Sequence, residues 1–349
     1  MSDEILFSVE NGLGIIQLNR PAALNALSHT MCLPLDKHLR EWGSDPTIKA
    51  VLIKAAGEKA FCAGGDIRKL ADKGPEGPEY RRQFWRDEYR INTLIHEFPK
   101  PFIALIDGIF MGGGVGLSVH GSHRVVSEHA LFAMPETGIG LFPDVGGSYF
   151  LPRLSGALGN YLGLTGTRLK AADILAAGIA THHVKRADHP ALQAALAAEP
   201  LPDNAAVNAV ISRFTSAPGF PSVTALKPEI DRLFAAPSID ALMQALESDD
   251  SAFAAEQAKL LRTKSPTSVK LTFAQLAKGR ELGFRACMTM EWRLCNRVAL
   301  GHDFYEGVRA VIIDKDQSPR WKPASLEEVS DASIDAYFAE LPGDELTFI

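Results

Sequence analysis

Short apolar runs alternate with amphipathic stretches through the first half of the chain. The apolar runs predict strands at residues 4–9, 13–19, 49–55, 102–106, 123–127 and 131–134. Asn11-Gly12 joins the first two, and this dipeptide is typical of a β-hairpin turn. Apolar residues at helical spacing over 79–98 predict an amphipathic helix that ends before Pro99. Strands that alternate with helices indicate an α/β fold.

One more helix is predicted in the first half of the chain, over 28–42 with Ser28 as its cap, although Pro34 leaves the first residue of this helix open.

The second half of the chain has a different pattern. From about residue 145 the pattern is mostly helical, and no alternation typical of strands returns after residue 218. The chain is therefore predicted to divide into an α/β core at 1–215 and a helical region at 216–349. Helices are expected there at residues 222–248, 250–262 and 267–300.

Composition and charge exclude several classes of function. The formal net charge is -6 and no long basic run occurs, which disfavours binding to nucleic acid or to an anionic membrane. No stretch of 18 uncharged apolar residues is present, so no membrane span is predicted. The four cysteines form no C-x-x-C pair, and a disulfide framework is improbable at this low density, which indicates a reducing compartment. The first residues lack the features of a targeting segment, and a cytoplasmic location is predicted.

Two glycine-rich segments each follow a predicted strand and lead into a predicted helix. They are Ala63-Gly64-Gly65 and Gly112-Gly113-Gly114, and the helix after the second is predicted to extend to about His120. Free N–H groups at a helix start carry partial positive charge, and two of them directed at one oxygen form an oxyanion hole. Plain strand-to-helix turns are the alternative. A dinucleotide site is disfavoured, because Leu117 stands where that motif requires glycine and no acidic residue follows at the expected distance.

The segment from Phe132 to Gly147 carries two acids, Glu136 and Asp144, among apolar residues. A carboxyl group in apolar surroundings has a raised pKa unless it is paired, which suits acid–base chemistry near neutral pH. The alternatives are that Asp144 caps a helix and that Glu136 is an exposed loop residue.

Other candidate chemistries lack partners in the sequence. The histidine pairs His182-His183 and His120/His123 show no ligand spacing with cysteine or acid, so no metal site is predicted. Cys62 has no indicated histidine partner for nucleophilic catalysis. The residues around Ser118 lack the last glycine of G-x-S-x-G, so a serine hydrolase triad is not supported.

Taken together, these segments resemble the crotonase (enoyl-CoA hydratase/isomerase) superfamily over nearly the whole chain. The general match lies at Asn19-Arg20-Pro21, Leu24–Leu27, Ala60–Ile67, Gly112–Gly114, Pro135-Glu136 and Leu164–Gly166. A closer match to the thioester-hydrolysing branch of the superfamily lies at Arg86–Tyr89, Met111–Gly121, Phe132–Gly147, Asp303–Ala310 and Ile313–Asp316.

The resemblance implies a crotonase-type spiral of ββα units followed by a helical carboxy-terminal region. It implies that the N–H groups of Gly65 and Gly113 form the oxyanion hole, and that Gly113 contacts the substrate. Glu136 and Asp144 fall on the two active-site acids of the hydrolases, where they also bind substrate. Glu88 falls on a substrate-binding glutamate, with a solvated helix face as the alternative for this residue.

One departure from the superfamily pattern separates its branches. Hydratases carry a second glutamate two residues after the glycine triplet, where this chain has Gly116. The resemblance therefore implies hydrolysis of a short 3-hydroxyacyl-CoA thioester, with 3-hydroxyisobutyryl-CoA of valine catabolism as the expected substrate. Dienoyl-CoA isomerases share the aspartate at Asp144 and remain the nearest alternative, ahead of hydratases and a non-catalytic CoA-binding protein.

No cofactor or metal is expected, because coenzyme A is part of the substrate. Two assemblies stay open. One is a homo-oligomer, as is common in the superfamily, and the other is a single chain whose long carboxy-terminal region covers the same surface.

Overall fold

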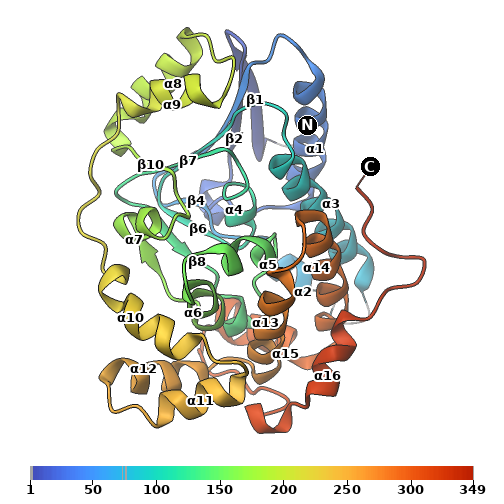
Figure 1. Cartoon of the computed structure of the whole chain (residues 1–349). Helices are drawn as coiled ribbons and strands as arrows, with labels where there is room; N and C mark the ends of the chain where they lie inside the picture. The colour runs from blue at the N-terminus through green and yellow to red at the C-terminus, as the bar shows by residue number, and fades with distance from the viewer. Residues whose placement is uncertain (1–2, 73, 75–76, 349) are drawn as a thin grey trace. The chain divides into compact units, whose positions relative to one another are not determined.

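A computed structural model of the chain describes residues 3–72, 74 and 77–348. These residues form two compact units, each assembled from three segments of the chain (Figure 1). The first unit comprises residues 1–65, 90–132 and 169–224, and the second comprises residues 66–89, 133–168 and 225–349. The sequence-based boundary between residues 215 and 216 stays a prediction.

A six-stranded sheet with the order β1-β2-β3-β5-β7-β10 forms the centre of the first unit. Its strands are β1 (Ile5–Glu10), β2 (Leu13–Leu18), β3 (Ala50–Ala55), β5 (Phe102–Ile106), β7 (His123–Val126) and β10 (His182–His183). Strands β1 and β2 pair antiparallel across Asn11 and Gly12, which both have positive φ, so the predicted hairpin is confirmed. The other neighbouring strands of the sheet run parallel.

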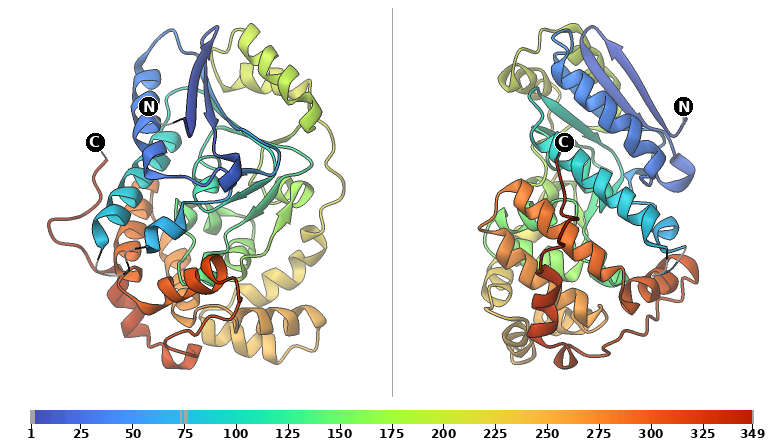
Figure 2. Two further views of the ribbon diagram at one scale, coloured as in Figure 1. Left: turned by 180° about the vertical axis from the view of Figure 1, so that it is seen from behind. Right: turned by 90° about the vertical axis from the view of Figure 1, so that its right-hand side faces the viewer.

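Successive residues of β2 point to opposite faces of this sheet, and different helices cover the two faces. Leu13 and Ile15 share a buried cluster with the apolar residues of α8 (His189–Ala198) and α9 (Asn204–Ser212). Gly14 points the other way, where a Cβ atom would lie 2.7 Å from the ring of Trp42 in α1 (His29–Ser44). Figure 2 shows α1 alongside the β1–β2 hairpin. Helix α7 (Ala171–Ala176) also belongs to this unit.

A second, four-stranded sheet positions the glycine segments. Its order is β4 (Ala60–Cys62), β6 (Ile109–Met111), β8 (Leu131–Ala133) and β9 (Leu169–Lys170). Strands β4 and β6 are parallel neighbours, so the segments that follow them leave the same edge of the sheet. The helix after β6 is α4 (Gly113–Gly116), and it is shorter than the predicted helix, which extended to His120.

Helices dominate the second unit. They are α2 (Ile67–Ala71), α3 (Pro78–His96, with residues 90–96 in the first unit), α5 (Gly147–Phe150), α6 (Leu158–Thr165), α10 (Val223–Phe234), α11 (Ile239–Glu247), α12 (Ala252–Leu261), α13 (Pro266–Gly279), α14 (Phe284–Val298), α15 (His302–Val308) and α16 (Asp331–Asp335). The predicted helix at 222–248 is two helices, because Ser238 caps α11 by accepting a hydrogen bond from the Ala241 N–H. The one predicted at 267–300 is α13 and α14, with Gly283 before the second.

Two features of the fold bear on the environment of the protein. Within residues 3–72, 74 and 77–348, no helix combines the length and the apolar character needed to cross a bilayer. All four cysteines are buried free thiols, in agreement with the expectation from their spacing.

Candidate functional site

The two glycine segments of the first unit are packed closely against each other. A Cβ atom at Gly114 would lie 2.1 Å from the carbonyl oxygen of Cys62, so no other residue fits there without movement of the backbone. Gly64 has φ +118°, a conformation that favours glycine. A Cβ atom added there would lie 3.6 Å from the Met111 carbonyl oxygen. Close backbone approach therefore requires glycine at Gly114, and the backbone conformation favours glycine at Gly64.

Two backbone donors of these segments are unused. Within the described residues, the N–H groups of Gly65 and Gly113 donate to no backbone or side-chain acceptor. Gly113 is buried and begins α4, where the first N–H groups of a helix have no partner inside the helix. Both donors are therefore available to an external acceptor such as a carbonyl oxygen.

The second unit contains the three acids that the sequence singled out. Glu136 begins a single-turn helix (Glu136–Ile139), Asp144 lies in the loop before α5, and Glu88 lies on α3. Glu88 is 2% exposed, and Glu136 and Asp144 are each 5% exposed. The alternatives of an exposed loop acid for Glu136 and a solvated helix face for Glu88 are therefore wrong.

Asp144 is held by a side chain from α3. The Tyr89 hydroxyl donates a hydrogen bond to Asp144 Oδ2 over 2.9 Å. Burial raises the pKa of Asp144 to about 7, although the hydrogen bond from Tyr89 acts in the opposite direction. The alternative of a helix cap fails, because Gly146 occupies the cap position of α5.

Glu136 and Glu88 are less well satisfied than Asp144. Glu136 Oε2 and Glu88 Oε1 are buried without a hydrogen-bond partner in the described part of the chain. Burial, and after it the charge of Asp144, raises the pKa of both groups well above the usual range for glutamate. Buried acids that repel one another hold protons near neutral pH, and an unpartnered carboxyl oxygen can take up or release one.

Two further residues of this acidic cluster were not predicted. Tyr89 stands next to Glu88 in the sequence but received no role of its own. Glu291 on α14 is fully buried and accepts hydrogen bonds from Gly146 and Ser148 in the loop after Asp144. Its sequence signal is an acid on the helix face formed by Cys287, Met288, Leu294 and Cys295, because acids are almost never fully buried without a partner.

Residues considered for other chemistries have structural partners. Cys62 Sγ lies 3.5 Å from the Gly64 carbonyl oxygen, and Ser118 Oγ donates to the Gly114 carbonyl oxygen over 2.8 Å. His183 Nδ1 lies 2.9 Å from the Ser216 carbonyl oxygen. No group of three or more histidine, cysteine or acidic side chains is placed to hold a metal ion among the residues that the structure describes.

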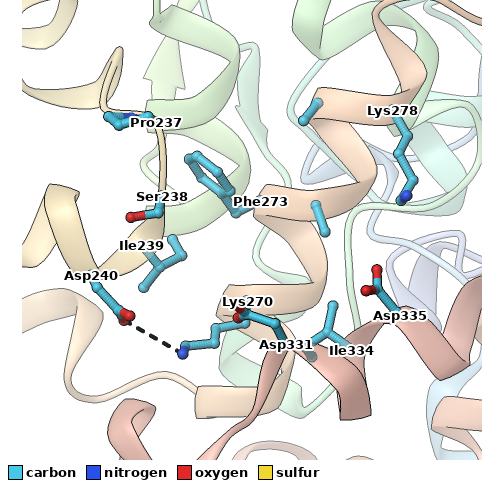
Figure 3. A pocket seen from close by; sticks show the side chains of 12 residues that line it. Pro237, Ser238, Ile239, Asp240, Lys270, Phe273, Lys278, Asp331, Ile334 and Asp335 are labelled. Carbon is cyan, nitrogen blue, oxygen red and sulfur yellow. Dashed lines mark ion pairs between the residues drawn. The ribbon is translucent and has the colours of Figure 1, made fainter.

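A cavity of about 330 Å³ in the second unit lies among the carboxy-terminal helices (Figure 3). Phe273, Ile239 and Ile334 contribute apolar surface, and Lys270 pairs with Asp240 at 3.4 Å on its rim. None of the five predicted site residues lines this cavity.

Comparison with known proteins gives the family. The family model for enoyl-CoA hydratase/isomerase matches residues 13–338. The chain belongs to this family. It is 48% identical to the 3-hydroxyisobutyryl-CoA hydrolase, mitochondrial, of Gallus gallus, over 98% of this chain and 90% of that protein. The protein of the same name from Homo sapiens is 44% identical over 99% of this chain and 91% of the relative.

Solved structures of the family agree with the fold. A carnitinyl-CoA dehydratase from Mycobacterium thermoresistibile matches with a TM-score of 0.93 and 36% identity, over 99% of each chain. An enoyl-CoA hydratase from Rhodobacter sphaeroides 2.4.1 matches with a TM-score of 0.90 and 42% identity, over 99% of this chain and 100% of the other. The predicted crotonase-type α/β fold with a helical carboxy-terminal region is confirmed.

The predicted cytoplasmic location is wrong. The curated relatives are named as mitochondrial proteins, which contradicts it. The prediction rested only on the composition of the first residues of the sequence.

Proposed function

We propose that this protein is an acyl-CoA thioester hydrolase that converts 3-hydroxyisobutyryl-CoA to 3-hydroxyisobutyrate and coenzyme A, a step of valine catabolism. The observation that carries the proposal is the buried, unpartnered carboxyl oxygen of Glu136, whose pKa is raised by burial and by Asp144. The choice of substrate follows the relatives, which are 44–50% identical over nearly the full chain and are named for this hydrolase activity.

In this proposal the N–H groups of Gly65 and Gly113 bind the thioester carbonyl oxygen. Charge develops on that oxygen when a nucleophile attacks, and one such donor is typically worth roughly 10²–10³ in rate. Support comes from the two N–H groups themselves, which have no acceptor among the described residues, and from the close packing of the two glycine segments.

Glu136 carries the chemical step by one of two routes. In the first, it removes a proton from water, the hydroxide adds to the carbonyl carbon, and the C–S bond breaks to release coenzyme A thiolate. In the second, the Glu136 carboxylate itself attacks, coenzyme A leaves, and water then hydrolyses the resulting anhydride. In both routes the thiolate takes the proton that the water gave up, so the products are the free acid and the thiol.

Asp144 and Glu88 are assigned to the acyl group. Asp144 accepts a hydrogen bond from the 3-hydroxyl of the substrate or holds the attacking water, and Glu88 helps to orient the acyl end. The buried Oε1 of Glu88 has no partner in the described part of the chain, so a hydroxyl of the substrate would satisfy it. Coenzyme A enters as part of the substrate, and the proposal includes no separate cofactor.

Hydration or isomerisation is the second candidate function. The two solved structures are titled as a dehydratase and a hydratase, and their identity to this chain is only moderately lower than that of the hydrolases. Gly116 opposes hydration, because it replaces the second glutamate that would hold the water with the first. Asp144 keeps the isomerase alternative open, because dienoyl-CoA isomerases resemble this chain at that position.

The test is a substrate comparison with the purified protein. We expect thiol release from 3-hydroxyisobutyryl-CoA, followed with a thiol reagent, and no change in the ultraviolet band of an enoyl-CoA or dienoyl-CoA. A changed band without thiol release would replace the proposal with hydration or isomerisation. Tight coenzyme A binding without turnover of any of the three would identify a binding protein instead.

We also retain the homo-oligomer as part of this proposal. The mass of the particle in solution, measured by light scattering, separates it from a single chain of 37.8 kDa.

A further inference from the structure

The loop that follows Asp144 has an unfavourable backbone conformation. Val145 has φ 51° and Gly146 has φ 86°, so two consecutive residues are in the left-handed region. Glycine adopts this region readily, but a β-branched residue such as valine does so at a cost. Val145 is also buried, at 1% exposure, so its conformation is set by the residues packed around it. Something in the surrounding structure must hold it.

Glu291 on α14 supplies three hydrogen bonds to this loop. Its Oε2 accepts the N–H of Gly146 at 2.8 Å, and its Oε1 accepts the N–H of Ser148 at 3.0 Å and the hydroxyl of Ser148 at 2.5 Å. Figure 1 shows α14 beside α5, the short helix that begins at Gly147. Each oxygen of this carboxyl group is therefore directed at the turn immediately after Asp144.

Burial of this acid is expensive in free energy. Glu291 is 0% exposed, and it has no cationic partner in the described part of the chain. Burial raises the pKa of Glu291 to about 8, despite the hydrogen bonds that stabilise its ionised form. An apolar residue at this position of α14 would avoid that cost, but it would leave the N–H groups of Gly146 and Ser148 without this acceptor.

These bonds and the hydrogen bond from Tyr89 act on different parts of the segment that carries Asp144. The Tyr89 hydroxyl fixes the carboxyl end of the Asp144 side chain, and Glu291 fixes the backbone from which that side chain extends. The residue before Asp144 is held as well, because Gln275 donates to the Pro143 carbonyl oxygen over 2.6 Å. Hydrogen bonds thus hold both the carboxylate of Asp144 and the backbone on either side of this residue.

We propose that Glu291 is a positioning residue, which holds the strained turn Val145–Ser148 so that Asp144 presents its carboxylate to the acyl group. This inference rests on the proposed function, because that function makes Asp144 a residue that contacts substrate. Glu291 itself touches neither substrate nor reacting atoms and acts through Asp144.

The test combines Glu291→Gln with Asp144→Asn. In Glu291→Gln an NH₂ group replaces one accepting oxygen and faces the N–H and O–H donors of the turn. We therefore expect kcat to fall roughly 10–100-fold, the loss typical of a misplaced catalytic group. KM should change little. In the Asp144→Asn background the same change should cause little further loss, because residues that act as a unit are not additive. Losses that multiply instead would overturn the inference in favour of a general structural role.

Two controls keep the outcome clear. Glu291→Asp keeps a carboxyl group and should recover part of the lost kcat. If Glu291→Gln does not fold, Ser148→Ala carries the same test, because it removes only the hydroxyl donor and should cause a smaller loss of kcat, again absent in the Asp144→Asn background.

A second measurement is independent of the substrate. Amide hydrogen exchange of Gly146 and Ser148 should be faster in Glu291→Gln by roughly three- to tenfold, the factor expected when a hydrogen bond is lost. Unchanged exchange would overturn the inference even if the wild type proves inactive. An inactive wild type with faster exchange in the variant would reject the proposed function and retain the positioning role.

Discussion

The Tyr89 hydroxyl lies 2.9 Å from Asp144 Oδ2 and donates a hydrogen bond to it, and both side chains are buried. This bond lowers the pKa of Asp144, while burial raises it to about 7. Tyr89→Phe removes the donor, so the pKa of Asp144 should rise further. If catalysis requires the ionised form, the acidic limb of the pH–kcat profile should move to higher pH by about one unit, equivalent to about 1.4 kcal/mol.

Tyr305→Phe is the matched control for this prediction. Tyr305 donates to the Ala299 carbonyl oxygen and not to an acid, so its loss should leave the acidic limb in place. A limb that stays in place in Tyr89→Phe would show that this hydrogen bond does not set the ionisation of Asp144.

Gly114→Ala should separate the two glycine segments. The added methyl group would lie 2.1 Å from the Cys62 carbonyl oxygen, so the backbone must move. We expect the free energy of unfolding to fall by about 1–3 kcal/mol. We also expect thioesterase activity to fall by roughly 10²-fold, because Gly113 would shift with its neighbour.

Gly43→Ala provides the comparison for Gly114→Ala. The added methyl group there meets Phe98 at 3.6 Å, an ordinary contact, and lies within a helix that favours alanine over glycine. Its stability, measured by chemical denaturation, should be equal to or above that of the wild type. Equal effects of the two substitutions would argue against a special role for the Gly114 contact.

The contribution of the acidic cluster to stability should fall as pH rises, because burial opposes ionisation of these acids in the folded state. The pKa of Glu88 is raised well above 4.5 by burial, then by Asp144 and Glu291. Between the unfolded and folded pKa values the folded state binds more protons, so the free energy of unfolding decreases with increasing pH. Glu88→Gln removes this contribution and should narrow the difference in stability between pH 5 and pH 8 by at least about 1.4 kcal/mol.

Chemical denaturation at the two pH values provides the measurement. Glu79→Gln is the control, since Glu79 is an exposed acid on the same helix, and it should leave the difference unchanged. A Glu88→Gln protein with the pH dependence of the wild type would contradict the assigned environment of Glu88.

Sequence patterns predicted the strands better than the helix ends. The hairpin at Asn11-Gly12 and the six predicted strands follow from local periodicity, but the short strands β4, β6, β9 and β10 were not predicted. The split between α10 and α11 was missed, because it depends on the Ser238 cap within a continuous polar and apolar pattern. The four-residue length of α4 was also missed, since glycines mark a turn but not how far a helix continues.

Some residues of the candidate site could be predicted from local sequence, and others could not. Glu136 and Asp144 lie close in sequence within a distinctive segment, so they could be singled out together. Glu291 lies more than a hundred positions away, and only tertiary packing brings its carboxylate to the Gly146 and Ser148 amides. Tyr89 was part of a recognised pattern, but its contact with Asp144 depends on the direction of one side chain and not on spacing.

The most direct test of the central claim is thiol release from 3-hydroxyisobutyryl-CoA by the wild type and by Glu136→Gln. The amide keeps the size of the side chain but cannot accept a proton or attack the carbonyl. The loss should therefore be roughly 10²–10⁴-fold in kcat. Glu281→Gln, at an exposed position, should match the wild type. Turnover by Glu136→Gln at the wild-type rate would contradict the account.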